Sequence, residues 1–479
     1  MEPRYPLEKS SLLQSRKINQ SLDVLILAAG LGTRMKSARA KVLHEIGGLP
    51  LIVYVCRTAQ ALDPQKIFVV VGHQATEVEA AVQNEIGNLG EFVKQTEQRG
   101  TGDAVMAARL EFSDRDSLLL VLSGDVPLIR QETLESFIDN HRSNQAACSL
   151  LSVRLENPTG YGRVIRDGND TFVRIIEQKD ATPEEQKIKE INAGIYCFDS
   201  RKLFTALERV SPSNKQGEYY LTDVPQILLS AGEAVNVYLH GDAREVSGIN
   251  TRAELAEFEN LVRRNTIRKL MTEVGVTFID PSHAYISAAA EIGRDCIIYP
   301  DVSIEGKSSL GQNCEIRSGT RITNSRLADN VVIKDHCVII DSEIASNVSV
   351  GPFAHLRMNT RLEENSVVGN FVEIKKSSLG RGSKSMHLTY LGDATIGEET
   401  NIGAGTITCN YDGKNKNATI IEDDVKIGSD TMLVAPVRVG KGSVTAAGSV
   451  VTEDVPPNTL VAGVPAVVKK RLDKESDES

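Results

Sequence analysis

Two short segments in the N-terminal half carry residue types that could bind phosphate groups and a divalent cation. Residues 27–35 read LAAGLGTRM, and the glycines would let backbone N–H groups approach phosphate oxygens while Arg34 adds a positive charge. Residues 123–127 read SGDVP, so Asp125 closely follows an aliphatic run. Mg²⁺ in proteins is held by one or two carboxylates together with substrate phosphates. The two segments therefore suggest chemistry on a metal-bound phosphate.

Neither segment is decisive alone. The turn is not a dinucleotide-binding fingerprint, because Met35 stands near the place of the third glycine, and no GKS or GKT follows as in a Walker loop. A plain strand-to-helix turn therefore remains an alternative for residues 27–35. A helix-capping role likewise remains an alternative for Asp125.

An α/β domain would position these segments. Aliphatic runs at residues 24–27, 67–71 and 118–122 alternate with amphipathic stretches. This alternation predicts a Rossmann-like α/β fold, with a mostly parallel sheet and helices on both faces. Ligands of such sheets lie beyond the carboxyl ends of the strands, where both segments fall.

The C-terminal half repeats every six residues. From Ile292 to Val451 an aliphatic residue returns at this interval, often followed by glycine, with two short steps. No α-helix and no ordinary strand has this period, whereas a β-helix places one short strand on each side of a three-sided prism. Residues 381–391 and 408–420 interrupt the rhythm. We expect loops there, and loops commonly carry function.

Three hexads would close one coil, so residues three hexads apart should stack. Cys296 and Cys314 have this separation, and Cys337 follows after three further hexads and one short step. We expect all three to form one column of small packed side chains rather than a metal site. The other cysteines are scattered without a CxxC pair, which favours a reducing cytoplasm.

Several motifs resemble known transferase families. GLGTRM followed by KVLH at residues 41–44 is similar to the signature of sugar-1-phosphate nucleotidyltransferases, and the hexads over about residues 291–456 resemble the left-handed β-helix of acyltransferases. Both halves resemble the bacterial bifunctional N-acetylglucosamine-1-phosphate uridylyltransferase/glucosamine-1-phosphate acetyltransferase family over about residues 22–456. The matching segments include QTEQRGTG at 95–102, PTGYGR at 158–163, HLTYLGD at 387–393, NIGAGT at 401–406 and CNYDG at 409–413.

The resemblance implies that the N-terminal domain transfers a uridylyl group from UTP to N-acetylglucosamine-1-phosphate and releases pyrophosphate. The attacking phosphate is already an anion, so such an enzyme needs charge neutralisation and alignment rather than a general base. By resemblance Arg34 and Lys41 offset phosphate charge, and Asp125 and Asn250 hold Mg²⁺. The nucleotide and the sugar would contact Leu27, Ala28, Ala29, Gly30, Lys41, Gln95, Gly100, Thr101, Ser123, Gly124, Asp125, Gly162, Glu177, Asn192 and Asn250. The alternatives are a surface lysine at Lys41 and a solvated carboxylate at Glu177.

The resemblance further implies that the C-terminal domain acetylates glucosamine-1-phosphate with acetyl-CoA. The substrate ammonium must lose a proton before attacking a thioester, and histidine titrates near neutral pH. By resemblance His387 is the general base, the alternative being a packed loop histidine, whereas His336 and His355 fall within regular hexads. The sugar phosphate would contact Arg357, Lys375, Tyr390, Asn401 and Glu373. Acetyl-CoA would contact Ala404, whose N–H is the family's oxyanion donor, with Asn410, Tyr411, Ser429 and Ala447.

Three positions depart from the family pattern. Ala40 replaces the usual proline before Lys41, which puts the conformation of that loop in question. Met358 and Asn359 replace a Pro-Gly turn after Arg357, which puts the shape of the phosphate contact in question. The family's C-terminal arginine for the CoA phosphates has no counterpart at residues 463–465, and the cations available to replace it are Lys469, Lys470 and Arg471.

Composition limits the remaining options. The 479 residues are too many for one core, which predicts at least two domains. A net charge of -10 and the absence of Trp make nucleic acid a poor partner. No apolar run is long enough for a membrane helix, and residues 1–20 hold no segment typical of a secretory signal, so we expect a cytoplasmic protein.

We expect four segments along the chain. They are a flexible N-terminal extension at residues 1–21, a nucleotidyltransferase domain at 22–251, a linker helix at 252–274 and a left-handed β-helix at 275–479, whose tail is disordered from Lys469. The resemblance also implies a homotrimer, because the family's acetyl-transfer sites use neighbouring β-helices.

Two other functions are compatible with this architecture. A nucleotidyltransferase could carry the β-helix only for oligomerisation, although the segments around His387 and Asn410 argue against this. A non-catalytic regulator, like the related subunits of a translation exchange factor, would not need Lys41, Asp125 and Asn250 together.

Overall fold

The computed structural model describes residues 20–472. The expectations for the extension at residues 1–19 and for the tail at 473–479 lie outside the described residues. The chain divides between Phe258 and Glu259 into two compact units, which are described separately. Within residues 20–472 no helix combines the length and the apolar character that crossing a membrane requires.

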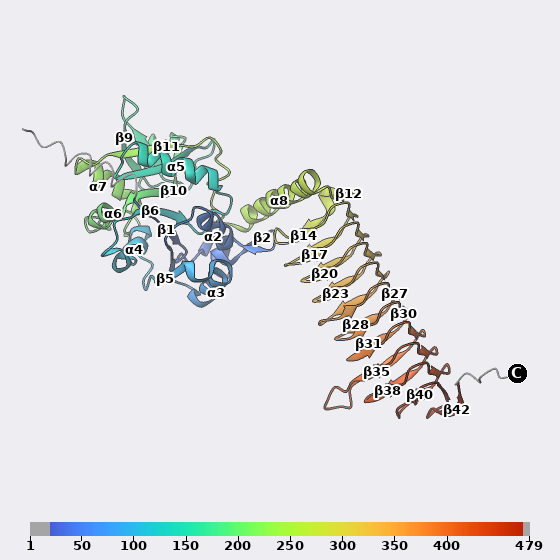
Figure 1. Ribbon diagram of the computed structural model, residues 1–479. Helices are drawn as coiled ribbons and strands as arrows, with labels where there is room; N and C mark the ends of the chain where they lie inside the picture. The colour runs from blue at the N-terminus through green and yellow to red at the C-terminus, as the bar shows by residue number, and fades with distance from the viewer. Residues whose placement is uncertain (1–19, 473–479) are drawn as a thin grey trace, which may run out of the picture. The chain divides into compact units, whose positions relative to one another are not determined.

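A mixed sheet forms the centre of the N-terminal unit (Figure 1). Only β10 runs antiparallel to its neighbours on this path, so the predicted mostly parallel sheet is confirmed. A hairpin of β8 (Arg163–Arg166) and β9 (Phe172–Ile176) attaches to β10. In spatial order the strands are β11 (Val235–Leu239), β7 (Cys148–Arg154), β10 (Glu190–Asp199), β6 (Leu118–Ser123), β1 (Leu22–Leu27), β4 (Ile67–Val71) and β5 (Gly90–Lys94).

Helices cover both faces of this sheet. Val24 and Ile26 of β1 pack into one core cluster while Leu25 packs into the other, as the two-residue period of a strand requires. Burial on both sides explains why the strands read as continuous aliphatic runs. One face is covered by α2 (Leu51–Ala61), α3 (Ala75–Ile86) and α5 (Gln131–Ser143), and the other by α4 (Thr101–Met106), α6 (Ser200–Leu207) and α7 (Val224–Ser230).

The segment after the sheet is helical. It forms α8 (Arg252–Lys269) and then a π-helical turn, Leu270–Val274. The division between the two compact units falls inside α8. Within α8 itself only Val262 and Ile267 are buried, and the other side chains are exposed or partly exposed.

The C-terminal unit is a left-handed parallel β-helix with three faces, as predicted (Figure 1). Inward aliphatic side chains of successive coils are almost completely buried in one continuous core. The first face contains β12 (Thr277–Phe278), β15 (Ile297–Ile298), β18 (Glu315–Ile316), β21 (Val332–Ile333), β24 (Ser349–Val350), β27 (Val367–Asn370), β30 (Lys384–His387), β33 (Asn401–Ile402), β36 (Lys426–Ile427), β39 (Val444–Thr445), β41 (Thr459–Ala462) and β42 (Val467–Arg471).

The other two faces have the same construction. The second contains β13 (Tyr285–Ile286), β16 (Ser303–Glu305), β19 (Arg321–Thr323), β22 (Val338–Ile340), β25 (His355–Arg357), β28 (Glu373–Lys375), β31 (Tyr390–Gly392), β34 (Ile407–Cys409), β37 (Met432–Val434) and β40 (Val450–Val451). The third contains β14 (Glu291–Ile292), β17 (Ser309–Leu310), β20 (Arg326–Leu327), β23 (Glu343–Ile344), β26 (Arg361–Leu362), β29 (Ser378–Leu379), β32 (Ala394–Ile396), β35 (Thr419–Ile421) and β38 (Val437–Val439).

Short polar residues fill many of the sharp corners of the prism. Asn313, Asn330 and Asn347 adopt φ values of 55°, 58° and 62°, a left-handed conformation that asparagine tolerates better than most residues. Their side chains also join successive coils. Asn313 Nδ2 donates to Asn330 Oδ1 at 3.3 Å, and Asn330 Nδ2 donates to Asn347 Oδ1 at 3.2 Å. This ladder stabilises the corner and fixes the stacking register.

The predicted cysteine column is only partly correct. Cys296 and Cys314 stack in adjacent coils, but Cys337 lies on the second face, next to Thr320. The reason is coil length. Glu315 pairs with Val332, so this coil is one residue shorter than three hexads and the column continues at Val331. Cys337 lies one hexad beyond Val331, which places it on the next face.

The predicted loop at residues 381–391 is wrong. This stretch forms β30 and β31 in regular register, and Ser385 occupies the inward position next to Val368, where an aliphatic residue was expected. By contrast, residues 408–420 do contain a loop, because Asn401 pairs with Lys426 and this coil exceeds three hexads by more than one further hexad. The tail is also ordered further than predicted, since Val467–Arg471 forms β42 antiparallel to β41.

The inward and outward positions of one strand should differ in their contribution to stability. Ile339 is completely buried in β22, whereas its neighbour Ile340 is only half-buried. We expect Ile339→Ala to lower the free energy of unfolding of the β-helix by about 2–5 kcal/mol, because it leaves a cavity in the core. Ile340→Ala, the matched control, should cost about 1 kcal/mol or less. Urea unfolding followed by circular dichroism measures both, and equal losses would contradict the assignment of inward positions.

Candidate active sites

The glycine-rich turn and Asp125 lie at the same edge of the sheet, because β1 and β6 are neighbouring parallel strands that end there. Lys41 begins a single 3-10 turn, and its ammonium group contacts the Asp125 carboxylate. The same ammonium donates a hydrogen bond of 3.2 Å to Asn250 Oδ1, and Arg34 Nη2 donates one of 2.7 Å to that oxygen. Four residues from separate segments of the chain therefore meet at one point.

Arg34, Lys41, Asp125 and Asn250 together are called the cation cluster below, because their arrangement fits a bound divalent cation. Asp125 Oδ2 and Asn250 Oδ1 both accept hydrogen bonds from the single Lys41 ammonium nitrogen, so the two oxygens lie close enough to share one cation. Mg²⁺ prefers carboxylate and amide oxygens and completes its shell with water and substrate phosphates. Within residues 20–472 no group of three or more His, Cys, Asp or Glu side chains is suited to a metal. A metal bound here would therefore take part of its coordination from the substrate.

Gly32 allows Lys41 to approach the cluster. Its φ of 60° is left-handed, and a Cβ at this position would lie 2.6 Å from Lys41 Cβ. A larger residue would therefore displace the lysine. Gly30 has open space around it, which leaves the outer surface of the turn accessible to a ligand. The Gly124 N–H donates to the Leu27 carbonyl at 3.0 Å and ties the ends of β6 and β1 together.

The residues expected to recognise the base gather at the start of α4. Gln95 is buried, and its Nε2 donates to Asp103 Oδ2 at 2.8 Å and to the Gly100 carbonyl at 3.3 Å. Thr101 Oγ1 accepts a hydrogen bond of 3.1 Å from the Leu221 N–H. These contacts hold all three expected residues in place without a ligand.

Gly162, Glu177 and Asn192 converge beside the β8–β9 hairpin. The Gly162 carbonyl accepts a 2.9 Å hydrogen bond from the Asn192 N–H, and a Cβ at Gly162 would lie 3.4 Å from Glu177 Oε1. Glu177 accepts a 3.2 Å hydrogen bond from the Thr222 hydroxyl, and both residues line a surface pocket. Burial raises the pKa of Glu177. A hydroxyl-rich ligand would give this carboxylate further hydrogen-bond donors.

The remaining residues of this predicted site belong to the strand ends. Ala28 and Ala29 are buried, so they can meet a ligand through the backbone only. Ser123 is partly exposed, and its Oγ lies 3.6 Å from where a Cβ on Gly194 would stand. Ser123 therefore lies between the cluster at Asp125 and the segment that follows Asn192.

Sequence reasoning missed two residues beside the cation cluster. Burial, and then the charges of Glu254 and Asp125, raise the pKa of Tyr161. Glu254 accepts a 2.6 Å hydrogen bond from the Asn250 N–H. The pattern Thr251-x-x-Glu254 before a helix is a capping-box signature, which would have indicated Glu254.

His387 belongs to a column of residues along one corner of the β-helix. It ends β30, and its Nδ1 lies 2.6 Å from Asn370 Oδ1. Because an amide oxygen can only accept, Nδ1 carries the proton and Nε2 is available as an acceptor. The Ala404 N–H has no hydrogen-bond acceptor within residues 20–472. By register, the corner column in successive coils is Asn370, His387, Ala404, Ser429 and Ala447.

Four residues expected at the sugar phosphate share the second face. Arg357 Nε donates to Glu373 Oε1 at 2.8 Å, and Glu373 lies next to Tyr390 in the neighbouring coil. Lys375 is only 7% exposed, and its ammonium lies 3.6 Å from the Asp393 carboxylate. Carboxylates of the same chain therefore balance both cations.

The structure does not bring Asn401 into this group. Asn401 lies on the first face next to Lys384, and no hydrogen bond of the described chain joins it to the second-face residues. Asn410 does approach them, because its Nδ2 donates to Asp393 Oδ2 at 2.6 Å. Tyr411 is 59% exposed and begins the loop of the long coil.

Comparison with known proteins identifies both halves. The nucleotidyl transferase family model matches residues 23–243, the GMPPB C-terminal domain model matches 281–379, and the model of six bacterial transferase hexapeptide repeats matches 418–453. The bifunctional protein GlmU of Syntrophomonas wolfei subsp. wolfei is 48% identical over 439 residues, which cover 92% of this chain and 96% of the relative. The chain belongs to the GlmU family. The bifunctional protein GlmU of Geobacillus sp. (strain WCH70) is 47% identical over 436 residues, covering 91% of this chain and 94% of that relative.

Membership of the GlmU family makes the chain a transferase with two functional domains. The nucleotidyl transferase match includes Lys41 and Asp125 and ends before Asn250, whereas His387 lies between the two C-terminal matches. The similarity to the GlmU relatives extends over nearly the whole chain and includes these residues.

The structure gives two of the departures from the GlmU pattern a physical account. Ala40 keeps a φ of -54°, close to the value that proline imposes, and its N–H donates to Gln74 Oε1 at 2.5 Å, which proline could not do. Met358 contacts the Arg357 guanidinium through its Sδ at 3.3 Å. Residues 469–471, the available cations near the C-terminus, are exposed on β42.

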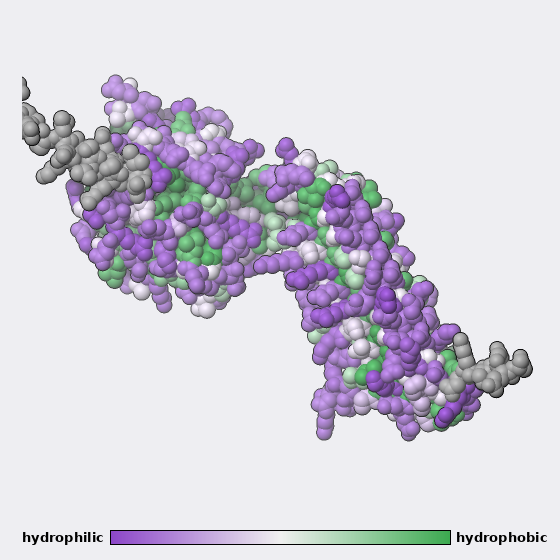
Figure 2. All heavy atoms as spheres, viewed as in Figure 1, coloured by the Kyte–Doolittle hydropathy of each residue, from purple (hydrophilic) through white to green (hydrophobic). Residues whose placement is uncertain are grey.

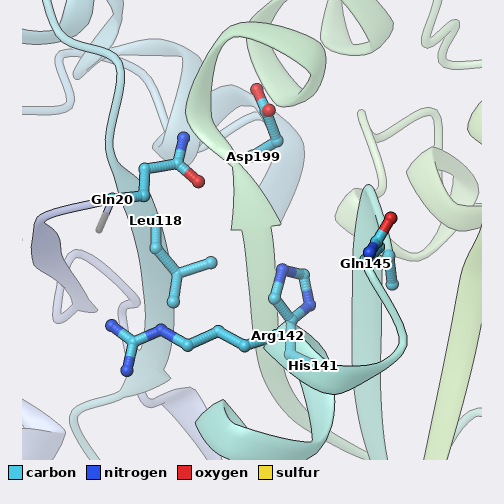
Figure 3. A pocket seen from close by; sticks show the side chains of 7 residues that line it. Gln20, Leu118, His141, Arg142, Gln145 and Asp199 are labelled. Atoms are coloured by element: carbon cyan, nitrogen blue, oxygen red, sulfur yellow. The ribbon is translucent and has the colours of Figure 1, made fainter. Parts of the chain in front are cut away.

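A small cavity lies at the amino-terminal ends of the parallel strands, opposite to the end that holds the cation cluster (Figure 3). Leu118 begins β6 and pairs with Asp199 at the end of β10, which places the cavity away from the carboxyl ends of the parallel strands. It is therefore not part of the nucleotide site. Figure 3 shows the side chains of Gln20, Leu118, His141, Arg142, Gln145 and Asp199 around it.

Proposed function

We propose that the chain synthesises UDP-N-acetylglucosamine in two steps, acetylating glucosamine-1-phosphate in the β-helix and then transferring uridylyl to the product in the N-terminal domain. The observation that carries this proposal is the meeting of Lys41, Asp125 and Asn250 at the carboxyl edge of the sheet. Family membership gives the second activity its support, because the relatives are named bifunctional proteins.

In the uridylyl transfer the protein aligns two polyanions. Lys41 and Arg34 offset the charge of the phosphates beside the open turn at Gly30. Mg²⁺, when held by Asp125 and Asn250, would supply further positive charge to the triphosphate. The base contacts Gln95, Gly100 and Thr101, and the sugar contacts Gly162, Glu177 and Asn192. The N-acetylglucosamine-1-phosphate oxygen attacks the α-phosphorus of UTP, and pyrophosphate leaves.

In the acetyl transfer the protein prepares an amine to attack a thioester. His387 Nε2 takes one proton from the substrate ammonium, and the amine nitrogen then bonds to the acetyl carbon to give a tetrahedral oxyanion. When this intermediate collapses, the carbon–sulfur bond of acetyl-CoA breaks, and the surplus proton on the nitrogen passes to the leaving CoA thiolate. The Ala404 N–H, one coil away from His387, stabilises the oxyanion. The sugar phosphate contacts Arg357, Lys375 and Tyr390, with Glu373 orienting the amine. Acetyl-CoA contacts Asn410, Tyr411, Ser429 and Ala447.

A substrate-omission experiment separates this function from the alternatives. Purified protein is incubated with glucosamine-1-phosphate, acetyl-CoA, UTP and Mg²⁺, and each component is left out in turn. The bifunctional proposal requires all four for UDP-N-acetylglucosamine. A nucleotidyltransferase alone would act only on supplied N-acetylglucosamine-1-phosphate, and a non-catalytic regulator would form neither product.

A homotrimer is the assembly that we propose, with each acetyl site completed by a neighbouring β-helix. A stack of rings supports contact with a second copy. His336 and Phe353 stack with centroids 5.2 Å apart, Phe353 and Phe371 stack at 5.3 Å, and Leu388 continues this corner next to His387. Phe353 and Phe371 are 48% and 54% exposed. The visible surface of the β-helix is otherwise mainly hydrophilic with separate hydrophobic patches (Figure 2).

These rings also occupy unfavourable backbone conformations. Phe353 and Phe371 both have a φ of 55°, which costs about 1–2 kcal/mol for an ordinary L residue. Glycine or asparagine would fit these corners more easily. Bulky apolar side chains retained in exposed, strained positions are typical of contact surfaces.

Asp125→Ala should abolish UTP-dependent pyrophosphate release and leave acetyl transfer unchanged. The change removes the carboxylate that Lys41 contacts, while the acetyl site belongs to the separate β-helix unit. Pyrophosphate release and CoA-thiol release are measured on the same preparation. Normal pyrophosphate release at ordinary Mg²⁺ concentration would refute the ligand role of Asp125.

His387→Ala should reduce acetyl transfer by about two to four orders of magnitude, as expected when a general base is lost. Uridylyl transfer from supplied N-acetylglucosamine-1-phosphate should stay at the wild-type rate. The measurement is thiol release at pH 7, with His283→Ala, an exposed histidine elsewhere in the unit, as the matched control. Wild-type acetyl transfer in His387→Ala would mean that another base operates.

The double substitution Phe353→Ala/Phe371→Ala should weaken the trimer at micromolar concentration, because buried aromatic side chains commonly dominate interface energies. Light scattering coupled to size exclusion gives the mass of each variant. Tyr285→Ala, at another exposed aromatic position of the β-helix, should leave the mass unchanged. A wild-type protein of single-chain mass would overturn the trimer, and an unchanged double variant would overturn the role of the rings.

A further inference from the structure

Asn250 lies two residues before the start of α8, and Glu254 in the first turn of that helix holds its backbone. Thr251 and Glu254 form a capping box, in which Thr251 Oγ1 accepts from the Glu254 N–H at 3.2 Å and Glu254 Oε2 accepts from the Thr251 N–H at 2.9 Å. The same Glu254 oxygen accepts a shorter hydrogen bond, 2.6 Å, from the Asn250 N–H. The carboxylate therefore reaches one residue beyond the usual box.

The side chain of Asn250 is held on its other side by the cation cluster. Its Oδ1 accepts hydrogen bonds from Arg34 Nη2 and Lys41 Nζ, and its Nδ2 donates to the Gly248 carbonyl at 3.2 Å. The amide orientation is consequently fixed, with the oxygen toward Arg34 and Lys41 and the nitrogen toward the Gly248 carbonyl. The position of Asn250 Oδ1 also depends on the backbone of Asn250, and the Glu254 side chain binds that backbone through its N–H group.

We infer that Glu254 is a positioning residue for the metal ligand Asn250, an inference that rests on the proposed uridylyl transfer. Glu254 touches neither substrate nor metal in this role. It fixes the Asn250 N–H, so that Asn250 Oδ1 stays within reach of the cation that Asp125 also binds. Residues that orient a metal ligand in this way commonly change metal affinity ten- to a hundredfold when they are removed.

The acceptor oxygen, rather than the charge, is the feature that matters. Glutamine supplies the same acceptor in capping boxes, so Glu254→Gln should retain the contact with Asn250, whereas Glu254→Ala removes it. A purely electrostatic role would give a different result, since Glu254→Gln would then be as harmful as Glu254→Ala. Glu257→Ala is the matched control, because Glu257 is an exposed carboxylate one turn later in the same helix.

The experiment measures metal binding directly in the full-length protein. Mn²⁺ replaces Mg²⁺, UDP-N-acetylglucosamine is present, and the electron paramagnetic resonance signal of free Mn²⁺ is titrated for wild type and the three variants. Glu254→Ala should weaken Mn²⁺ binding by about tenfold or more, and the other two variants by less than about threefold. The Mg²⁺ concentration for half-maximal uridylyl transfer should rise by the same factor in Glu254→Ala, with the rate recovering at saturating Mg²⁺.

The outcomes distinguish this inference from the proposed function. Wild-type protein that binds no Mn²⁺ or transfers no uridylyl group would overturn the function itself. With an active wild type, the positioning role is wrong if Glu254→Ala keeps normal Mn²⁺ affinity. It is also wrong if the uridylyl-transfer rate of Glu254→Ala stays low at saturating Mg²⁺ while the Mg²⁺ concentration for half-maximal transfer is unchanged. Equal losses in Glu254→Gln and Glu254→Ala would also overturn it. Acetyl transfer should be unchanged throughout and verifies that each preparation is folded in the other unit.

Discussion

The N-terminal site depends on one ammonium group that is shared between two oxygens. Lys41 lies between Asp125 and Asn250, and each of the three residues comes from a different part of the chain. Partly buried charges must be compensated by close partners, because isolated ones are costly away from water. The elements around them satisfy this requirement: β1 and β6 end side by side, Gly32 leaves room for the lysine, and α8 begins two residues after the asparagine.

The β-helix is governed by a different constraint. Each coil repeats the path of the previous one, so a position along a corner becomes a column of residues. This is how His387 and the Ala404 N–H come to lie in adjacent coils although a full turn of the prism separates them along the chain. A side chain and a backbone N–H group can therefore be aligned by stacking alone, without a dedicated loop. Rigid elements of this kind place functional groups more accurately than flexible segments do.

The parts of the structure with a clear period could be predicted from the sequence. The two-sided sheet and the three-faced prism follow from runs and intervals of buried residues, but individual coil lengths do not. One coil is a residue shorter than three hexads, and this places Cys337 on another face. The inward position of β30 is the polar Ser385 rather than an aliphatic residue, so the regular strand there could not be recognised from the aliphatic repeat. The sequence did not indicate Tyr161 and Glu254 as site residues. Tyr161 interacts with groups far away in the chain, and Glu254 binds a backbone N–H group, so neither interaction leaves a residue pattern of its own. The placement of Asn401 away from Lys375 likewise depends on which face each strand occupies.

The long coil that ends at Lys426 has a consequence for how this fold can change. Its extra residues leave the prism between two strands and return to it, and the strands on either side keep their normal partners. Additional chain at that corner therefore costs mainly loop-closure entropy, which grows slowly with length. The segment that begins at Asn410 and Tyr411 can lengthen, shorten or change composition while the interior packing stays the same. Under the proposed contact of this segment with acetyl-CoA, selectivity toward an acyl donor is free to diverge separately from stability.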